Sequence, residues 1–150
     1  MTDTPITTGT CRCGQVRITA QGAPLITFAC HCTGCQRMTA SAFSISALYP
    51  EAAVTIEGET IPGGMRGELH HHCCPSCLSW LFTTAPVMGP MVNIRSTMLE
   101  AGPAQKPPFI ECWTTEKRPW AETGARHSYP GFPPPEDFAR LMAEFGQGRA

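Results

Sequence analysis

A chain of 150 residues with 42% hydrophobic residues is long and apolar enough to fold around a core, which excludes a disordered protein. Its formal charge of −1 argues against nucleic acid as a partner, because the phosphate backbone requires a basic surface. No apolar run approaches a membrane span, and the first ten residues, MTDTPITTGT, lack the basic and apolar parts of a signal peptide. We therefore expect a cytoplasmic protein without a membrane partner, whose thiols stay reduced.

The predicted elements are mostly short strands, because fifteen prolines and fourteen glycines interrupt the chain. In residues 14–20, Val16 and Ile18 alternate with polar residues, as in a half-buried strand. Residues 63–77 begin at a Gly-Gly turn and are expected to run as a strand into a cysteine turn. The other predicted strands cover 24–30, 41–50, 52–59, 79–85, 90–99 and 108–115.

Only residues 134–145 are predicted to be helical, with proline and acidic residues at the start. Phe138, Leu141, Met142 and Phe145 then follow the i, i+3, i+4, i+7 spacing of a stripe that packs on a core. Neither an internal repeat nor a linker is evident, so we expect a single domain over residues 1–150.

Nine cysteines in a reducing compartment indicate metal binding more than disulfides, and an odd number cannot be fully paired. Two tight pairs, CRCG (Cys11, Cys13) and CPSC (Cys74, Cys77), together supply four thiolates for a tetrahedral structural zinc site. CPSC also fits a thioredoxin-type redox pair, but that motif opens a helix, whereas LSWLFTTAP after it is typical of a strand.

The stretch CHCTGCQRMTASAF (30–43) places Cys30, Cys32 and Cys35 within six positions. Three protein ligands and an open position are typical of a catalytic zinc, whereas a fourth protein ligand would make the site a closed one. The spacing leaves both alternatives open. The candidate fourth ligands are Cys73, Cys112, His31, His70, His71 and His72.

His31 lies between two of these cysteines, so in an extended chain its side chain points away from the metal. We expect a hydrogen-bonded core or supporting histidine rather than a base. Arg37 pairs either with an anionic substrate carboxylate or in an ordinary surface salt bridge.

Other residues near these motifs are assigned from their surroundings. Alternation places His70 and His72 on one face of a strand and His71 on the other, and we expect partial exposure without function. Aromatic and hydroxyl side chains complete the set: Ser41 and Phe43 are expected to line or support a pocket, and Trp113 and Trp120 to lie in the core.

The order CxCG, strand, CHCxxCxRxxxSAF and CPxC resembles that of the glutathione-dependent formaldehyde-activating enzyme family, which includes the centromere-protein-V-like domains. The resemblance covers about residues 11–133, where EKRPWAETGARHSYPGFP (116–133) is similar to the family's tail. It implies a mainly β, Mss4-like tent of small antiparallel sheets with two zinc ions, to which the pattern of residues 134–145 adds a short C-terminal helix. One zinc would be structural, held by Cys11, Cys13, Cys74 and Cys77, and the other catalytic, held by Cys30, Cys32 and Cys35.

The implied activity is that of a carbon–sulfur lyase, which joins glutathione or a similar small thiol to formaldehyde, with Arg37 a candidate contact for the substrate. Two other functions compete with it: a non-catalytic zinc module for protein interaction, and a redox or metal sensor built on the spare thiols Cys73 and Cys112. A homodimer is compatible with all three. The chain departs from the family at Leu78, where the family has glycine after the last cysteine, so we expect a slightly strained turn there.

Overall fold

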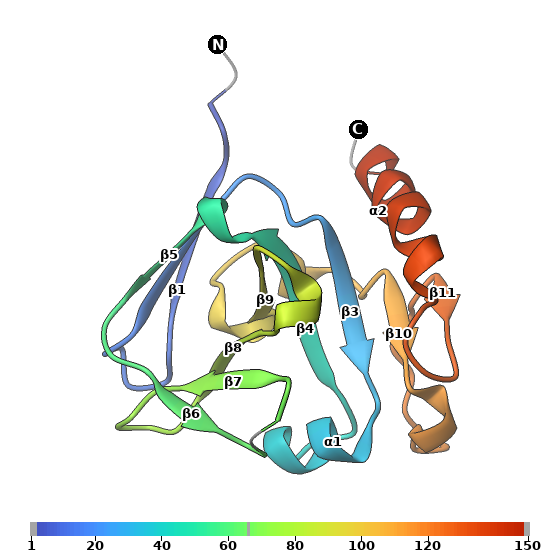
Figure 1. The fold of residues 1–150 in the computed structure, drawn as a ribbon, viewed down its shortest axis with the longest axis horizontal. Helices are drawn as coiled ribbons and strands as arrows, with labels where there is room; N and C mark the ends of the chain where they lie inside the picture. Colours follow the sequence, from blue (N-terminus) through green and yellow to red (C-terminus); the bar gives the residue numbers. More distant parts are fainter. Residues whose placement is uncertain (1–2, 66, 149–150) are drawn as a thin grey trace.

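The computed structural model describes residues 3–65 and 67–148, so position 66, inside the predicted strand 63–77, lies outside the described residues, as do the two residues at each end of the predicted domain. The described residues form two sheets and two helices (Figure 1). The smaller sheet is antiparallel, in the order β1 (Ile6–Thr10), β2 (Arg17–Gln21) and β5 (Val54–Glu57).

The larger sheet has the strand order β11-β10-β3-β4-β9-β8-β7-β6. Most neighbours are antiparallel, but the short β10 pairs in parallel with both β3 and β11. The strands are β3 (Ile26–Cys30), β4 (Ser44–Pro50), β6 (Ile61–Gly63), β7 (His70–Cys73), β8 (Trp80–Thr84), β9 (Met91–Arg95), β10 (Ile110–Cys112) and β11 (His127–Ser128).

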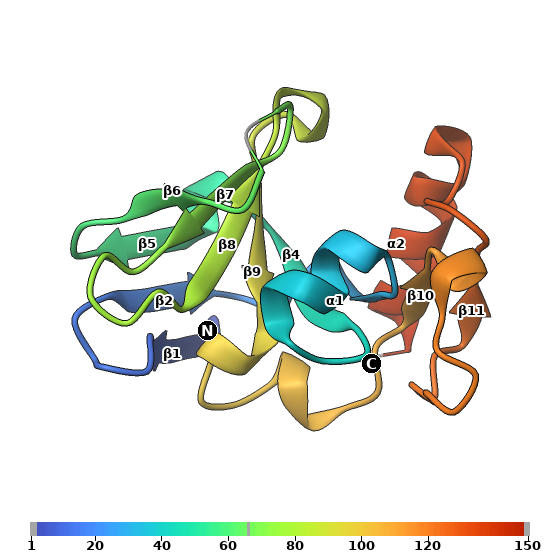
Figure 2. The same ribbon diagram turned by 90° about the horizontal axis from the view of Figure 1, so that it is seen from below.

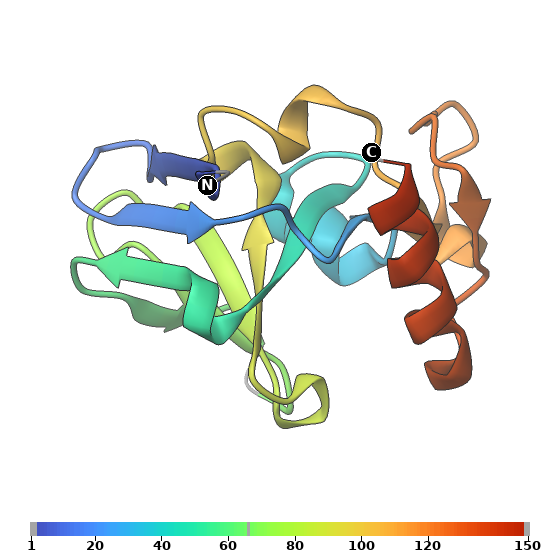
Figure 3. The same ribbon diagram turned by 90° about the horizontal axis from the view of Figure 1, so that it is seen from above.

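One hydrophobic core involves both sheets, with the fully buried Ile18 of β2 and Leu81 and Ile94 of the larger sheet among its members. Cys11 and Cys74 belong to the same core, so the first cysteine cluster is attached to it directly. The smaller sheet and the C-terminal helix lie at opposite ends of the molecule (Figures 2 and 3).

The C-terminal helix α2 (Phe138–Gln147) forms a second core with β3 and β10. Its fully buried Leu141 packs with Ile26, Phe28 and Ile110. Phe138, Met142 and Phe145 pack around this group, which confirms the predicted stripe. A short 3-10 turn, Pro135–Asp137, precedes the helix at the predicted proline-rich start.

The expected mainly β fold with a short C-terminal helix is confirmed, and every predicted strand overlaps an observed one. The expectation that only residues 134–145 are helical was wrong, because a second helix, α1 (Thr33–Thr39), follows β3. Strands β1, β6 and β11 were also not predicted. None of the helices within 3–65 and 67–148 is long and apolar enough to cross a bilayer.

Candidate metal centres

Two turns that are far apart in the sequence form a four-cysteine cluster. Cys11 and Cys13 follow β1, Cys74 and Cys77 follow β7, and their four Sγ atoms all lie within 4.8 Å of one another. Cys13 Sγ is 3.5 Å from that of Cys11 and 3.7 Å from that of Cys74. The pairs predicted from sequence are thus brought together in an arrangement that could hold one metal ion.

Backbone hydrogen bonds close both turns around these sulfurs. The amide of Cys11 donates to Val16 O at 3.0 Å, and that of Cys74 donates to Ser79 O at 3.0 Å. In the second turn Leu78 donates to Cys74 O at 3.0 Å and adopts a φ of +58°, a left-handed conformation that suits glycine. The strain predicted at Leu78 is therefore confirmed.

The same turns favour the thiolate form of two of the four cysteines, Cys11 and Cys77. The Val16 amide donates to Cys11 Sγ at 3.3 Å, and Cys77 Sγ lies 3.1 Å from the Ser79 hydroxyl. Hydrogen bonds from the hydroxyl and amide of Ser79 lower the pKa of Cys77 to about 5. Deprotonated sulfur is the form that binds zinc, so the donor set fits this metal.

A three-cysteine cluster surrounds the start of α1. Cys30 is the last residue of β3, Cys32 is the N-cap of α1, and Cys35 lies in its first turn, with all three Sγ atoms within 4.8 Å. The Cys35 amide donates to Cys32 Sγ at 3.3 Å, which both caps the helix and stabilises a thiolate. This cap ties the helix to the cluster.

Negative charge is shared unevenly among the three sulfurs. Hydrogen bonds from Cys30 and Cys35 lower the pKa of Cys32 to about 2. The pKa of Cys30 is raised, first by its contact with Cys112 and then by Cys32, and the pKa of Cys35 is raised by Cys30 and Cys32. One sulfur of this group ionises easily and the other two need a nearby cation, which a metal ion supplies when all three are its ligands.

The candidate fourth ligands from the sequence all lie in described parts of the chain, and none of the six joins the group. Cys112 comes nearest in register, directly opposite Cys30 on the neighbouring parallel strand, with its buried thiol donating to Ala29 O at 3.5 Å. Among the described residues the group therefore consists of three cysteines and no fourth protein ligand.

Cys73 lies apart from both clusters and from Cys112. It is on β7 and Cys112 is on β10, five strand positions away in the sheet, and both are buried free thiols. A disulfide needs Cα atoms within about 7 Å. This separation excludes a direct redox pair between the two and confirms that they are not bonded to each other.

His31 is a core histidine, as predicted. Its imidazole is fully buried, and Nε2 lies 2.9 Å from Oε2 of Glu111 on β10. Glu111 also accepts hydrogen bonds from Lys117, Thr123 and Ser128. This buried network supports the chain between Cys30 and Cys32.

Two of the three consecutive histidines of β7 contact hydroxyls and aromatic rings, and none of the three belongs to a metal group among the described residues. His71 lies 2.9 Å from the Thr83 hydroxyl with its ring edge-on to Trp80, and His72 stacks on Phe82 at 4.3 Å. His70 is exposed and the other two are half-buried, which confirms the predicted partial exposure.

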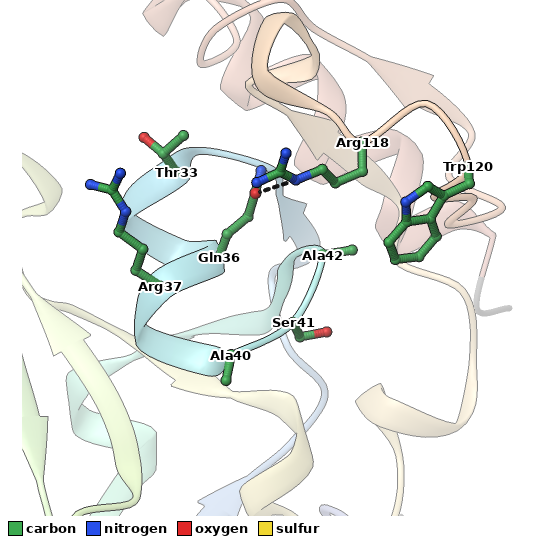
Figure 4. A pocket seen from close by; sticks show the side chains of 8 residues that line it. All are labelled: Thr33, Gln36, Arg37, Ala40, Ser41, Ala42, Arg118 and Trp120. Atoms are coloured by element: carbon green, nitrogen blue, oxygen red, sulfur yellow. Dashed lines mark hydrogen bonds between the residues drawn. The ribbon is translucent and has the colours of Figure 1, made fainter.

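A hollow of about 350 Å³ lies against the outer side of α1 and contains none of the three thiols (Figure 4). Arg37 lines it, and none of the ion pairs within the described residues uses this arginine. Arg118 also lines it and donates through Nε to Gln36 Oε1 at 2.8 Å. Ser41 lines it as predicted, whereas Phe43 packs against His31 with ring centroids 5.3 Å apart.

The prediction that Trp120 lies in the core was wrong. Its side chain is 74% exposed and forms one wall of the hollow, because it lies in a turn outside the sheets, closed by the hydrogen bond from the Ala121 amide to Arg118 O. Trp113 is half-buried and packs edge-on against Phe132, with ring centroids 6.0 Å apart. The two tryptophans therefore have different surroundings.

One charged residue beside the three-cysteine cluster escaped the sequence analysis. Arg95, the last residue of β9, is only 6% exposed and interacts electrostatically with Cys35, Cys30, Cys112 and Cys32. Its signal in the sequence was a lone cation within the apolar strand MVNIR.

Comparison with known proteins decides the family. A model of the glutathione-dependent formaldehyde-activating enzyme family matches residues 6–116, which include every cysteine of both clusters. The chain belongs to this family. The match begins five residues before the expected one and ends before the hollow's Arg118 and Trp120.

The comparisons with curated proteins and with solved structures concern the fold of the chain. No curated protein matches the chain. The crystal structure of a Rhodobacter sphaeroides protein is similar with a TM-score of 0.50 and 21% identity, over 65% of this chain and 93% of that one. At this identity the likeness concerns the fold alone.

Proposed function

We propose that this family member is a zinc-dependent carbon–sulfur lyase that acts on glutathione or a similar thiol–aldehyde adduct. The observation that carries the proposal is the three-cysteine group, which has no fourth protein ligand among the described residues. Its reaction centre would be held by Cys30, Cys32 and Cys35. A structural zinc would be held by Cys11, Cys13, Cys74 and Cys77, two of which are built into the hydrophobic core.

The donor set suits sulfur chemistry. When bound, a zinc ion with three thiolates would carry a formal charge of −1. It would therefore lower the pKa of a bound water less than a zinc with three histidines does. Such a zinc is better suited as an exchangeable binding site for a thiolate or a carbonyl oxygen. In the proposed reaction the substrate sulfur attacks the formaldehyde carbon, the carbon–sulfur bond forms, and the carbonyl π bond breaks. The thiol proton ends on the new hydroxyl oxygen.

The chain's own residues would bind and orient the thiol. Arg37 and Arg118 are exposed cations on the hollow beside α1, and glutathione carries two carboxylates. The helix is about 10 Å long, so a tripeptide in the hollow would lie on the helix whose first turn carries Cys35. Holding both reactants on one helix reduces the entropy cost of bringing them together.

A non-catalytic interaction module is the second candidate, favoured by the exposed indole of Trp120 in the same hollow. Aromatic residues of this kind are enriched at protein interfaces. The two proposals differ in what the three-cysteine cluster does with a small thiol, since a module needs no exchange of metal ligands there.

Cobalt substitution tests the lyase proposal, because sulfur-to-metal absorption bands report a new thiolate ligand. Millimolar glutathione should change the bands of the three-cysteine cluster, whereas S-methylglutathione, which has no thiol, should not. Cys35→Ala should abolish the response, and Arg37→Ala should weaken thiol affinity without changing metal content. Bands that glutathione and formaldehyde both leave unchanged would overturn the lyase proposal in favour of the interaction module.

A further inference from the structure

A buried cation without a carboxylate partner lies beside the three-cysteine cluster. Arg95 is 6% exposed, and burial lowers its pKa only to about 10, so it stays charged at neutral pH. None of the ion pairs within residues 3–65 and 67–148 includes it. Leaving a charge buried and unpaired is costly, so a negative partner is to be expected.

The guanidinium is held in a fixed position. Its central carbon lies 3.9 Å above the Trp80 ring, a cation–π contact. Nη1 donates to the Ser44 hydroxyl at 3.3 Å and Nη2 to Asn93 O at 3.4 Å. The buried Nε has no partner among the described residues, so one donor remains unused.

Ser44 connects this cation to the thiols. It lies opposite Cys30 in the pairing of β3 with β4, and its hydroxyl acts to lower the pKa of the Cys35 thiol. The same hydroxyl accepts from Arg95, so one side chain links the guanidinium to the cluster. Burial lowers the pKa of Arg95, whereas nearby cysteines raise it. The largest of these opposing effects come from Cys35 and Cys30.

We propose that Arg95 is the built-in countercharge of the three-cysteine centre, a positioning residue that stabilises its thiolates and allows a fourth, anionic sulfur to bind there. A divalent metal with three thiolates has a net charge of −1, which Arg95 brings to zero. A docked substrate thiolate then leaves the assembly at −1 instead of −2. This last step rests on the proposed function, whereas the stabilisation of the three protein thiolates does not.

The four-cysteine cluster shows why the countercharge is needed at only one place. Cys13 is exposed, so water solvates part of the charge of that cluster, and the Val16 amide and the Ser79 hydroxyl contact two of its sulfurs. The three cysteines of the other group are all half-buried, and a neighbouring strand, β9, provides the guanidinium instead.

Zinc release to a colorimetric chelator tests the first part of the proposal with the zinc-loaded protein. Arg95→Met should accelerate release from the three-cysteine cluster by about tenfold or more, because it removes a buried cation that interacts electrostatically with these cysteines in a low-dielectric site. Arg95→Lys keeps the charge and should stay near the wild-type rate. The matched control, Arg17→Met, removes an exposed arginine on β2 and should change nothing.

Zinc should leave in two phases, a fast one from the three-cysteine cluster and a slow one from the four-cysteine cluster. The slow phase distinguishes an effect of the Arg95 charge from a general loss of folded structure. A merely structural role would accelerate both phases, whereas a countercharge acts on one. The second part is read from cobalt-substituted protein, in which the dissociation constant of glutathione should rise about tenfold in Arg95→Met and less in Arg95→Lys. Absorption bands of the wild-type cobalt protein that do not change with glutathione would refute the lyase proposal. The rate of zinc release would still test the role of Arg95 as a countercharge.

An Arg95→Met variant with the wild-type rate of zinc release would overturn the inference. Should that variant fail to fold, Ser44→Ala takes its place, because it breaks the link between Arg95 and Cys35 while keeping the charge. We expect about threefold faster release from the three-cysteine cluster in Ser44→Ala. An unchanged rate there contradicts the proposal equally.

Discussion

The fully buried imidazole of His31 is tied to the carboxylate of Glu111 by a hydrogen bond of 2.9 Å, which joins the chain between Cys30 and Cys32 to β10. Burial by itself would raise the pKa of Glu111. Hydrogen bonds from Ser128, His31, Lys117 and Thr123 outweigh it and hold the pKa at about 2. The ionised carboxylate is therefore part of the support for the three-cysteine cluster.

Glu111→Gln should lower the free energy of unfolding at pH 7 by about 3 kcal/mol, because a shift of this size stabilises the folded state by that order. A depressed folded-state pKa gives stability that is fully present above the unfolded value of 4.5 and is lost as the pH falls towards about 2. The difference between wild type and variant in urea unfolding should shrink over this window. The exposed Glu122→Gln is the control, and a pH-independent difference would contradict the assignment.

Leu78→Gly should stabilise the protein by about 1 kcal/mol, because glycine adopts a left-handed φ without the steric cost that leucine has there. The Leu78 side chain is 67% exposed, so its removal loses little packing. Urea unfolding measures the change. Leu78→Ala keeps the strain and should show no gain, and an equal gain in both variants would mean that side-chain exposure is responsible.

Several features could be predicted from the sequence because they depend on local pattern. The strands and the stripe of α2 follow from periodicity, and both cysteine clusters follow from short spacings that bring sulfurs together. The strain at Leu78 was predicted from the family's glycine at that position and is confirmed by its φ.

Helix α1 could not be predicted in this way. It is only seven residues long and contains a glycine and two threonines, which are weak helix formers. What stabilises it is the cap, in which Cys32 Sγ accepts from the Cys35 amide, and the backbone bond from the Gln36 amide to Cys32 O. These contacts belong to the cysteine cluster and leave no periodic signal.

Arg95 and Trp120 depend on tertiary contacts. Sequence pattern gives no partner for a lone arginine in an apolar strand, and only the pairing of β9 with β4 brings it to Ser44. Trp120 was assigned to the core from the usual burial of tryptophan, whereas a turn outside the sheets leaves it at the surface. Neither position could be inferred without the strand order.

Gly63→Ala should destabilise the protein by about 1–3 kcal/mol, because a Cβ there would overlap with Cys73 Sγ. The double variant Gly63→Ala, Cys73→Ala removes the sulfur and leaves the Cβ of residue 73 at 3.5 Å, an ordinary contact. It should therefore recover stability relative to Gly63→Ala, with a coupling energy measurable in a double-mutant cycle. Simple additivity of the two single changes would show that the contact does not exist.

The two cysteine clusters should respond differently to loss of one ligand. Cys74 is fully buried and belongs to the hydrophobic core, so Cys74→Ser should lose both its zinc and the fold. Cys32 is half-buried at the start of a seven-residue helix, so Cys32→Ser should leave a folded protein.

Metal analysis together with circular dichroism checks this division. Wild type should contain two zinc ions per chain, of which a chelator removes the one at Cys30, Cys32 and Cys35 first, because water can enter where a protein ligand is lacking. Cys32→Ser should retain one zinc and the wild-type spectrum of a β protein. The serine hydroxyl is close to the thiol in size, so unfolding of Cys74→Ser would report loss of the metal ligand rather than loss of packing. Equal unfolding of the two variants would mean that both centres are structural, and the three-cysteine cluster could then no longer be assigned to catalysis alone.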